Sequence, residues 1–186
     1  MAILHNATLV PSKREILAGW LPAQPWFPGG GFAPVGSFRL DDPAGEVGVE
    51  LALVRADDGT VIHVPCTYRG AEAPDLAHAL MGTAEHSVLG TRWFYDADAD
   101  PVYQAVVRQA ILAGAAQAAE DWHHPDGTVA RRASTVRAQG VPGDRADDDA
   151  VVRTVRLPHL HAPGIPALVA TWDGQDEPLV VAFLEC

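Results

Sequence analysis

The chain of 186 residues is long enough for a single domain, which at this size buries roughly 70% of the surface that its unfolded chain exposes. Its 48% hydrophobic and 20% charged residues are typical of a folded globular protein and exclude a disordered or collagen-like chain. The net charge of −11 repels phosphate backbones and anionic headgroups, so we expect neither nucleic acid nor a membrane surface as a partner.

Targeting and redox signals are equally sparse. No run approaches the ~20 apolar residues that span a bilayer, and the N-terminus lacks the basic and apolar regions of a secretory signal. The two cysteines, Cys66 and Cys186, form no Cys-x-x-Cys pair, so we expect no disulfide framework. These features predict a cytoplasmic protein.

A strand and a capped helix are the first predicted elements. Residues 2–9 predict a short strand. Ser12 and Glu15 then have the spacing of a capping box, which predicts a helix through Trp20. Pro22 ends this helix, because proline disfavours helical geometry at the preceding residue and has no N–H to donate.

Residues 35–69 predict a meander of three antiparallel strands, separated by turn signals at 41–45 and 57–59. Apolar residues alternate from Val47 to Leu53, which predicts a strand with one better-buried face. We interpret the acidic residues of this region as a solvated rim that discourages edge pairing: Asp41, Asp42, Glu46, Glu50, Asp57 and Asp58. A further strand is predicted over 88–95.

The second half begins with a helix and continues with strands. Asp100 and Pro101 form a helix start, and we expect the helix to run to about Glu120. Strands follow near 128–138, 151–157, 166–172 and 178–184. Strand meanders around two helices, without βαβ alternation, predict an α+β fold with a curved antiparallel sheet packed against helices.

The first 112 residues also contain a series of short segments in a distinctive order and spacing: ILH (3–5), PSKREIL (11–17), WLPAQPW (20–26), GSFRL (36–40), VIHVP (61–65), TYRG (67–70), GTAEHSVLG (82–90) and RW (92–93). Together these segments resemble the N-terminal cap domain of bacterial maltokinases. The resemblance implies a cystatin-like fold for this half, in which a curved antiparallel sheet lies against a helix.

In that family the cap is not the catalyst, and it is attached to a kinase-like body that phosphorylates maltose on a route to glycogen. After the second predicted helix this sequence has no His-Gly-Asp-type catalytic loop, no Asp-Phe-Glu-type metal motif and no G-x-x-x-x-G-K-[ST] loop. We therefore expect residues 1–112 to form a cap-like region and 113–186 a β-rich extension packed with it as one unit, without enzymatic activity.

Two histidine clusters have the residue types of a metal site. One contains His159 and His161, and the other His123, His124 and Asp126. A zinc site needs three or four ligands within tetrahedral reach, and both clusters adjoin prolines in predicted loops. We interpret them as solvated histidines and expect no metal and no other cofactor.

A hydrolytic site is the other catalytic possibility. Glu85, His86 and Ser87 are an acid, a base and a hydroxyl in succession, but adjacent side chains of a strand point to opposite faces. Cys66 has no neighbouring base in the sequence and is interpreted as a small buried hydrophobe. An enzyme built around Glu85 and His86 stays open as a third hypothesis.

Aromatic residues are the candidate contacts for the two leading hypotheses. The first is a non-catalytic accessory module that binds a partner protein, a kinase or a glucan or trehalose enzyme, in maltose, trehalose or glycogen metabolism. Its expected contacts are Trp26 and Phe27 in a Pro- and Gly-rich loop, while Trp93 and Tyr103 pack in the core. The second is a small-molecule or saccharide-binding protein, with Trp93, Tyr95 and Tyr103 lining a pocket between sheet and helix.

Overall fold

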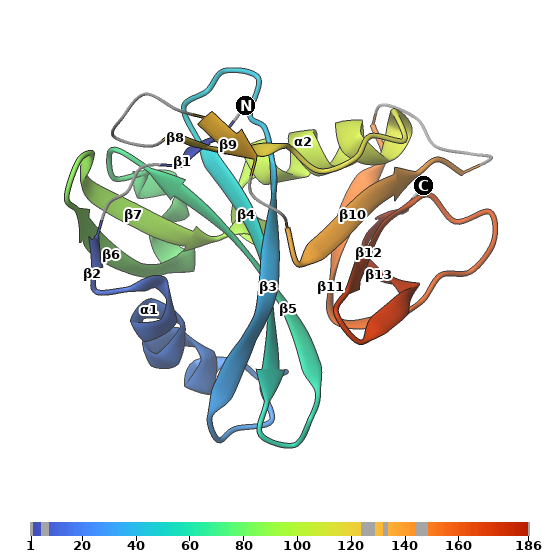
Figure 1. Ribbon diagram of the computed structural model, residues 1–186, viewed down its shortest axis with the longest axis horizontal. Coiled ribbons are helices and arrows are strands. Elements are labelled where there is room, and N and C mark those ends of the chain that lie inside the picture. The colour runs from blue at the N-terminus through green and yellow to red at the C-terminus, as the bar shows by residue number, and fades with distance from the viewer. Residues whose placement is uncertain (1, 5–7, 124–128, 132–133, 144–148, 186) are drawn as a thin grey trace.

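In the residues that the structure describes, the chain forms three β-sheets and two α-helices (Figure 1). The computed structural model describes residues 2–4, 8–123, 129–131, 134–143 and 149–185. Strands make up 48% of the structure and helices 20%, and the two larger sheets are antiparallel, so the predicted α+β class is confirmed.

The first sheet is a curled six-stranded antiparallel sheet in the order β2-β6-β7-β5-β4-β3. Its strands are β2 (Leu9–Val10), β3 (Phe32–Leu40), β4 (Gly48–Ala56), β5 (Val61–Arg69), β6 (Leu80–His86) and β7 (Gly90–Asp96). The meander β3-β4-β5 is the predicted one. Strand β6 was not predicted, because only Ala84 of its seven residues is buried and no alternating apolar pattern marks it.

Helix α1 (Lys13–Trp20) lies on one face of this sheet and begins at the predicted capping box. The Ser12 hydroxyl accepts a hydrogen bond from the Glu15 N–H at 3.3 Å, and the Glu15 carboxylate accepts one from the Ser12 N–H at 2.8 Å. A 3₁₀ turn, η1 (Leu21–Ala23), follows it. Two more 3₁₀ turns, η2 (Pro74–Ala79) and η3 (Ala97–Ala99), flank the β6-β7 hairpin.

Helix α2 (Pro101–Leu112) begins where predicted, but the expectation that it runs to about Glu120 was wrong. Gly114 adopts a left-handed conformation with φ of 59°, which ends the helix. The next residues then bond to strands, since the N–H of Gln117 donates to Ala138 and that of Ala118 donates to Arg39. Tertiary hydrogen bonds therefore outweigh the helical propensity of this alanine-rich segment.

The second sheet has the order β10-β12-β13-β11, with β10 (Val136–Val141), β11 (Val151–Leu160), β12 (Ala167–Trp172) and β13 (Gln175–Glu185). A small third sheet joins the start of the chain to the segment after α2: β1 (Ala2–Leu4) runs parallel to β8 (Glu120–His123), which pairs with β9 (Val129–Arg131). The single strand predicted near 128–138 is thus two strands, β9 and β10.

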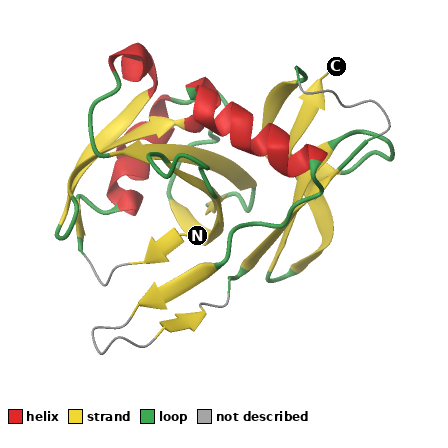
Figure 2. Ribbon diagram, turned by 90° about the horizontal axis from the view of Figure 1, so that it is seen from above, coloured by secondary structure: helices red, strands yellow, loops and turns green. Residues whose placement is uncertain are grey.

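Both faces of the first sheet are covered. On one face Ile62 and Cys66 of β5 pack beneath α1. On the other face Val49 and Leu51 of β4 belong to a core shared with α2 and the second sheet, and both side chains are almost fully buried. Figures 1 and 2 show α2 bridging the two sheets, so one hydrophobic core joins the two halves of the chain.

Two buried polar residues of this core tie its layers together. His63 of β5 is fully buried, and its Nδ1 donates to the Val155 carbonyl of β11 at 3.1 Å. Burial and the nearby Arg156 charge lower the pKa of His63 to about 3. Asp100 is also fully buried and accepts hydrogen bonds from the Thr67 hydroxyl at 2.7 Å and the Arg69 guanidinium at 2.5 Å, as well as capping α2.

Neither α-helix in the described part of the chain has the length and apolar character that a bilayer crossing requires.

Candidate ligand-binding cavity

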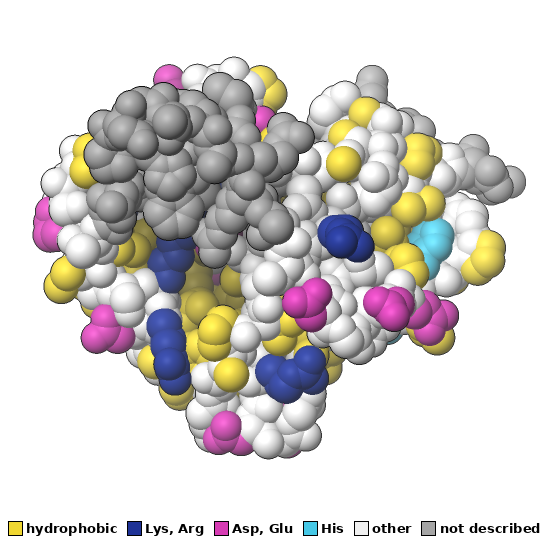
Figure 3. Space-filling model, in the orientation of Figure 1, with side chains coloured by type: hydrophobic (Ala, Val, Ile, Leu, Met, Phe, Trp, Pro, Cys, Tyr) yellow, Lys and Arg dark blue, Asp and Glu magenta, His cyan; other side chains and the backbone are white. Residues whose placement is uncertain are grey.

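A cavity of about 300 Å³ lies between α1 and the β3-β4-β5 part of the first sheet. Figure 3 shows it as a hollow with an apolar floor and Lys and Arg side chains around it. Most of its lining is apolar and comes from Ile16, Leu17, Phe32, Pro34, Ala52, Val54, Val64, Met81 and Phe94. Its volume is at the lower end of the range for small-molecule sites.

Local structure explains why these side chains meet. On α1, Lys13, Ile16 and Leu17 are spaced so that they share one helix face. On β4, Glu50 and Ala52 lie two residues apart and therefore share one face of the strand. The small Ala52 side chain leaves space in the middle of this face.

A buried ion cluster forms one end of the cavity. The Glu50 side chain is 8% exposed, contacts the Lys13 ammonium directly, and accepts a hydrogen bond from Arg39 at 3.2 Å. Burial raises the pKa of the Glu50 carboxyl, but the two neighbouring cations more than offset this and lower it to about 2. Burial lowers the pKa of Lys13, yet the Glu50 charge leaves that pKa above its ordinary value. Both groups are therefore charged at neutral pH.

The assignment of Glu50 to a solvated acidic rim was wrong, because this carboxylate points into the sheet face beneath α1. Its position in the alternating pattern of β4 was the signal that could have placed it there. Two other acids of that group are turn residues. Asp42 accepts hydrogen bonds from three backbone N–H groups of residues 44–47, and Asp57 accepts one from Gly31 at 2.6 Å.

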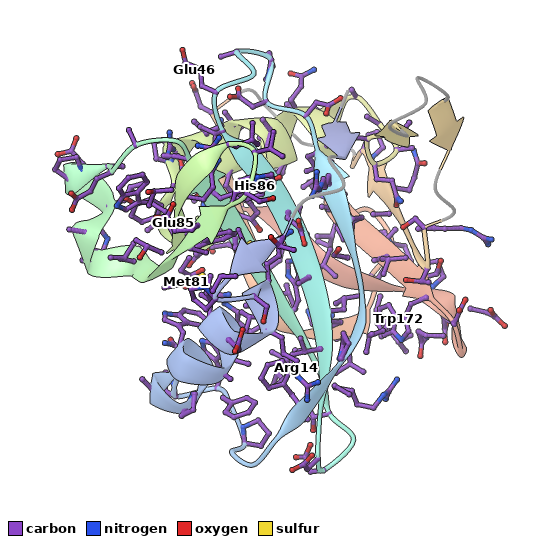
Figure 4. All side chains as sticks on the ribbon, turned by 60° about the vertical axis from the view of Figure 1, so that its left-hand side comes forward. Arg14, Glu46, Met81, Glu85, His86 and Trp172 are labelled. Carbon is purple, nitrogen blue, oxygen red and sulfur yellow. The ribbon has the colours of Figure 1, made fainter. Side chains whose placement is uncertain are left out.

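Arg14 is a second cation in the lining. Its side chain is exposed and forms no ion pair with any other residue that the structure describes. Figure 4 shows it between α1 and the neighbouring strands. Among the described lining residues, the charged ones are the cations Lys13 and Arg14 and the carboxylate Glu50, which sum to +1 on a chain whose net charge is −11.

Cys66 lines the same cavity from β5 and is buried, as predicted. Burial, and then the Glu50 charge, raises the pKa of the Cys66 thiol to about 12. A thiol that stays protonated is a poor nucleophile, so Cys66 contributes to the lining as a small apolar group.

The loop aromatics Trp26 and Phe27 lie outside this lining, and both are partly exposed. They pack against the cluster that contains Leu21 and Ile62. The Trp26 ring lies 5.6 Å from that of Trp20, and the Arg156 guanidinium of β11 lies 4.8 Å from the Trp26 ring centroid. The loop therefore contacts the second sheet while part of each ring remains accessible.

The three aromatics expected around a pocket are not brought together in this cavity. Trp93 is partly exposed on β7, whereas Tyr95 and Tyr103 are fully buried. The Tyr95 hydroxyl accepts a hydrogen bond from the Ala73 N–H at 2.8 Å, and the Tyr103 hydroxyl lies 3.0 Å from that of Thr154. Buried rings with satisfied hydroxyls offer no surface to a ligand, and the lining of this cavity comes from α1 and strands β3 to β7 instead.

The residues of the candidate hydrolytic site bond to separate partners around the β6-β7 hairpin. Glu85 accepts a hydrogen bond from the Thr91 hydroxyl at 2.6 Å, and the His86 Nδ1 accepts from the N–H groups of residues 88 and 89. The Ser87 hydroxyl accepts from Thr8 at 3.0 Å. The His86 nitrogen that is engaged in the turn is thereby unavailable to orient a triad.

The histidines of the second sheet bond to backbone carbonyls: His159 to Leu160 at 3.0 Å and His161 to Ile165 at 2.7 Å. Within the described ranges, no group of three His, Cys, Asp or Glu side chains is placed to hold a metal ion. The side chain of His123, and His124 and Asp126 as a whole, lie outside what the structure describes.

The fold and its cavity define an α+β protein in which a curled antiparallel sheet and a helix enclose a small, mainly apolar site. Residues 20–100 match the sequence model of the maltokinase N-terminal cap domain. The cap is a non-catalytic N-terminal module of maltokinase-like proteins. A comparison with curated proteins gives no match.

The family match confirms the resemblance recognised in the sequence and also places the cavity relative to it. The match covers all of β3 to β7, which form the sheet side of the cavity. The α1 residues that form its other side, including Lys13 and Arg14, precede the matched segment, and α2 and the second sheet follow it.

Proposed function

We propose that this chain is a non-catalytic accessory module that binds a partner protein, a kinase or another enzyme of maltose, trehalose or glycogen metabolism. The observation that carries the proposal is the cap-family match over residues 20–100, in a chain whose remaining described residues form two helices and β-sheets. Because the matching module is non-catalytic, we expect this segment to bind or stabilise another protein and not to catalyse a reaction. The kinase motifs that would argue otherwise do not occur in these 186 residues.

The proposed contact surface is the loop with Trp26 and Phe27. Both rings keep part of their surface accessible, and the Arg156 side chain lies against Trp26. Aromatic side chains are enriched where proteins bind one another, while Arg156, which is 13% exposed and bound to Asp96, holds the Trp26 ring in place. This combination supports the loop as a docking surface.

The test is capture of interacting proteins from a lysate of the source organism, followed by calorimetry with the purified candidate. We expect a stoichiometric complex that weakens at least tenfold for Phe27→Ala, while Leu160→Ala, a change at an exposed residue of β11, leaves it unchanged. Phe27→Ala keeps the contact between Trp26 and Arg156, and thermal unfolding checks its fold. Equal binding by the two variants would refute the loop as the contact, and failure of every purified glucan enzyme to bind would refute the proposal.

The cavity favours a second candidate function, the binding of a small molecule. An apolar cavity of about 150 Å³ accommodates benzene, so a volume of about 300 Å³ accommodates roughly ten non-hydrogen atoms. A disaccharide has roughly twice as many and is polar throughout, whereas this lining is mainly apolar. The geometry therefore supports a small apolar ligand better than maltose or trehalose, and titration calorimetry with both sugars should give flat traces.

A further inference from the structure

We propose that the cavity beneath α1 binds an aliphatic carboxylate of about ten non-hydrogen atoms, with its chain on the apolar floor and its carboxylate at Arg14 and Lys13. This inference rests on the second candidate function and names the chemistry of its ligand. It is independent of whether the chain also binds a partner protein.

The apolar part of the ligand follows from the floor of the cavity. Ile16 and Leu17 of α1 face Val64 and Met81 of the sheet across it. Branched and flexible aliphatic side chains fit a thin, flexible chain, and Met is especially able to adapt its shape. Burying such a chain removes apolar surface from water on both sides, which supplies the affinity.

The charge of the ligand follows from the cations in the lining. Arg14 is exposed and has no carboxylate partner among the described residues. Lys13 bonds to Glu50, but its side chain is 40% exposed and an ammonium has three donors. A carboxylate placed between them would receive charge-assisted hydrogen bonds and neutralise the local charge of +1.

A cationic ligand fits the same site poorly. Glu50, the one carboxylate among the lining residues that the structure describes, already accepts from Lys13 and Arg39 and is 8% exposed. To bind an amine, it would have to give up partners that hold it ionised in a buried position, which is costly. Charge complementarity therefore selects an anion.

The experiment is titration calorimetry of the full chain with octanoate, which has ten non-hydrogen atoms, and with octanol, which is similar in shape but uncharged. We expect octanoate to bind at least tenfold more tightly than octanol. Arg14→Gln should weaken octanoate binding about tenfold and leave octanol binding unchanged. Arg153→Gln, at an exposed arginine of the second sheet, is the matched control and should change neither.

Two further measurements test whether the ligand binds inside the cavity. Ala52→Leu fills the space beneath α1 and should abolish binding of both ligands, with circular dichroism to check that the variant folds. The chain has two methionines, so NMR of their labelled methyl groups is simple to assign. Octanoate should shift the methyl signal of Met81, because the Met81 side chain lines the cavity. This measurement uses the wild-type protein and therefore does not depend on whether Ala52→Leu folds.

The possible outcomes distinguish the anionic ligand proposed here from the small-molecule site of the second candidate function. Equal affinity for octanol and octanoate, or an unchanged affinity in Arg14→Gln, would refute the anionic ligand while the cavity remains a site for small apolar molecules. If neither ligand binds and the Met81 signal stays in place, both the inference and the second candidate function fail.

Discussion

Replacing His63 by glutamine should make the stability of this protein less sensitive to acid. The His63 imidazole is fully buried between the two sheets, where burial and the Arg156 charge lower its pKa from 6.5 to about 3. In the unfolded chain the imidazole binds a proton below about pH 6.5, whereas in the folded protein it stays neutral down to about pH 3. Stability from this group is therefore complete above pH 6.5 and is lost as the pH falls toward 3.

The loss of stability depends on how far the pH falls below 6.5, the pKa of His63 in the unfolded chain. Each pH unit below 6.5 lowers the free energy of unfolding by about 1.4 kcal/mol, so His63 accounts for a loss of about 2 kcal/mol between pH 6.5 and 5. Below pH 4.5 the depressed pKa of Glu50 adds a loss of the same sign. Measurements that stop at pH 5 therefore isolate the histidine.

The assay is urea unfolding of the wild type and His63→Gln at constant ionic strength and several values of pH from 8 to 5. The variant loses stability at every pH through altered packing, but its dependence on pH should be shallower by about 2 kcal/mol over this range. Val107→Ala, which removes buried apolar volume from α2, controls for loss of stability as such and should keep the wild-type slope. Equal slopes for the wild type and His63→Gln would refute a buried neutral imidazole.

Three further predictions concern stability and reactivity. Asp100→Ala should lower the free energy of unfolding by about 3–5 kcal/mol in urea titrations, because it removes the cap of α2 and leaves the partly buried Arg69 without its carboxylate partner. A loss below about 1 kcal/mol would contradict this. Gly140→Ala should lower the free energy of unfolding by about 1–3 kcal/mol, because the added Cβ would lie 2.0 Å from a carbonyl oxygen of α2. Gly19→Ala should raise it by about 0.5–1 kcal/mol, because the added Cβ meets no atom within 4 Å outside its own helix. Thermal unfolding tests both variants, and an unchanged stability of Gly140→Ala would refute the close approach. In a Cys186→Ser variant, Cys66 should react with a neutral disulfide probe at pH 7 only after unfolding, and fast labelling of the folded protein would show that it is accessible.

Local signals in the sequence predicted the parts of the fold that local physics decides. The capping box of Ser12 and Glu15 and the start of α2 at Asp100 depend on residues within three positions of one another. The end of α2 was mispredicted although it has a local signal, Gly114, whose left-handed conformation stops the helix. The alanine-rich segment after Gly114 then bonds to β10 and β3 instead of continuing the helix. Strand β6 was missed for a related reason: hydrogen bonding to β7, rather than an apolar pattern, defines it.

The cavity could not be predicted from these signals. Its charged end joins Lys13 to Glu50, which are 37 residues apart, and nothing local to either residue indicates the pairing. The aromatic residues drew attention because they are large and amphipathic, yet Tyr95 and Tyr103 use these properties inside the core. The cavity between sheet and helix lies under α1, and its walls are mainly aliphatic, with Phe32 and Phe94 as their aromatic members.

The shared core extends beyond the segment that matches the family model. The family segment ends at Asp100, but the β4 face that carries Val49 and Leu51 is shielded from water by α2 and the second sheet, which lie beyond that point. A polypeptide ending at residue 100 would expose this apolar face, so the matched segment is smaller than the unit that folds in this chain. Any relative that keeps the segment but lacks these later elements must have evolved another cover for the same side of the sheet.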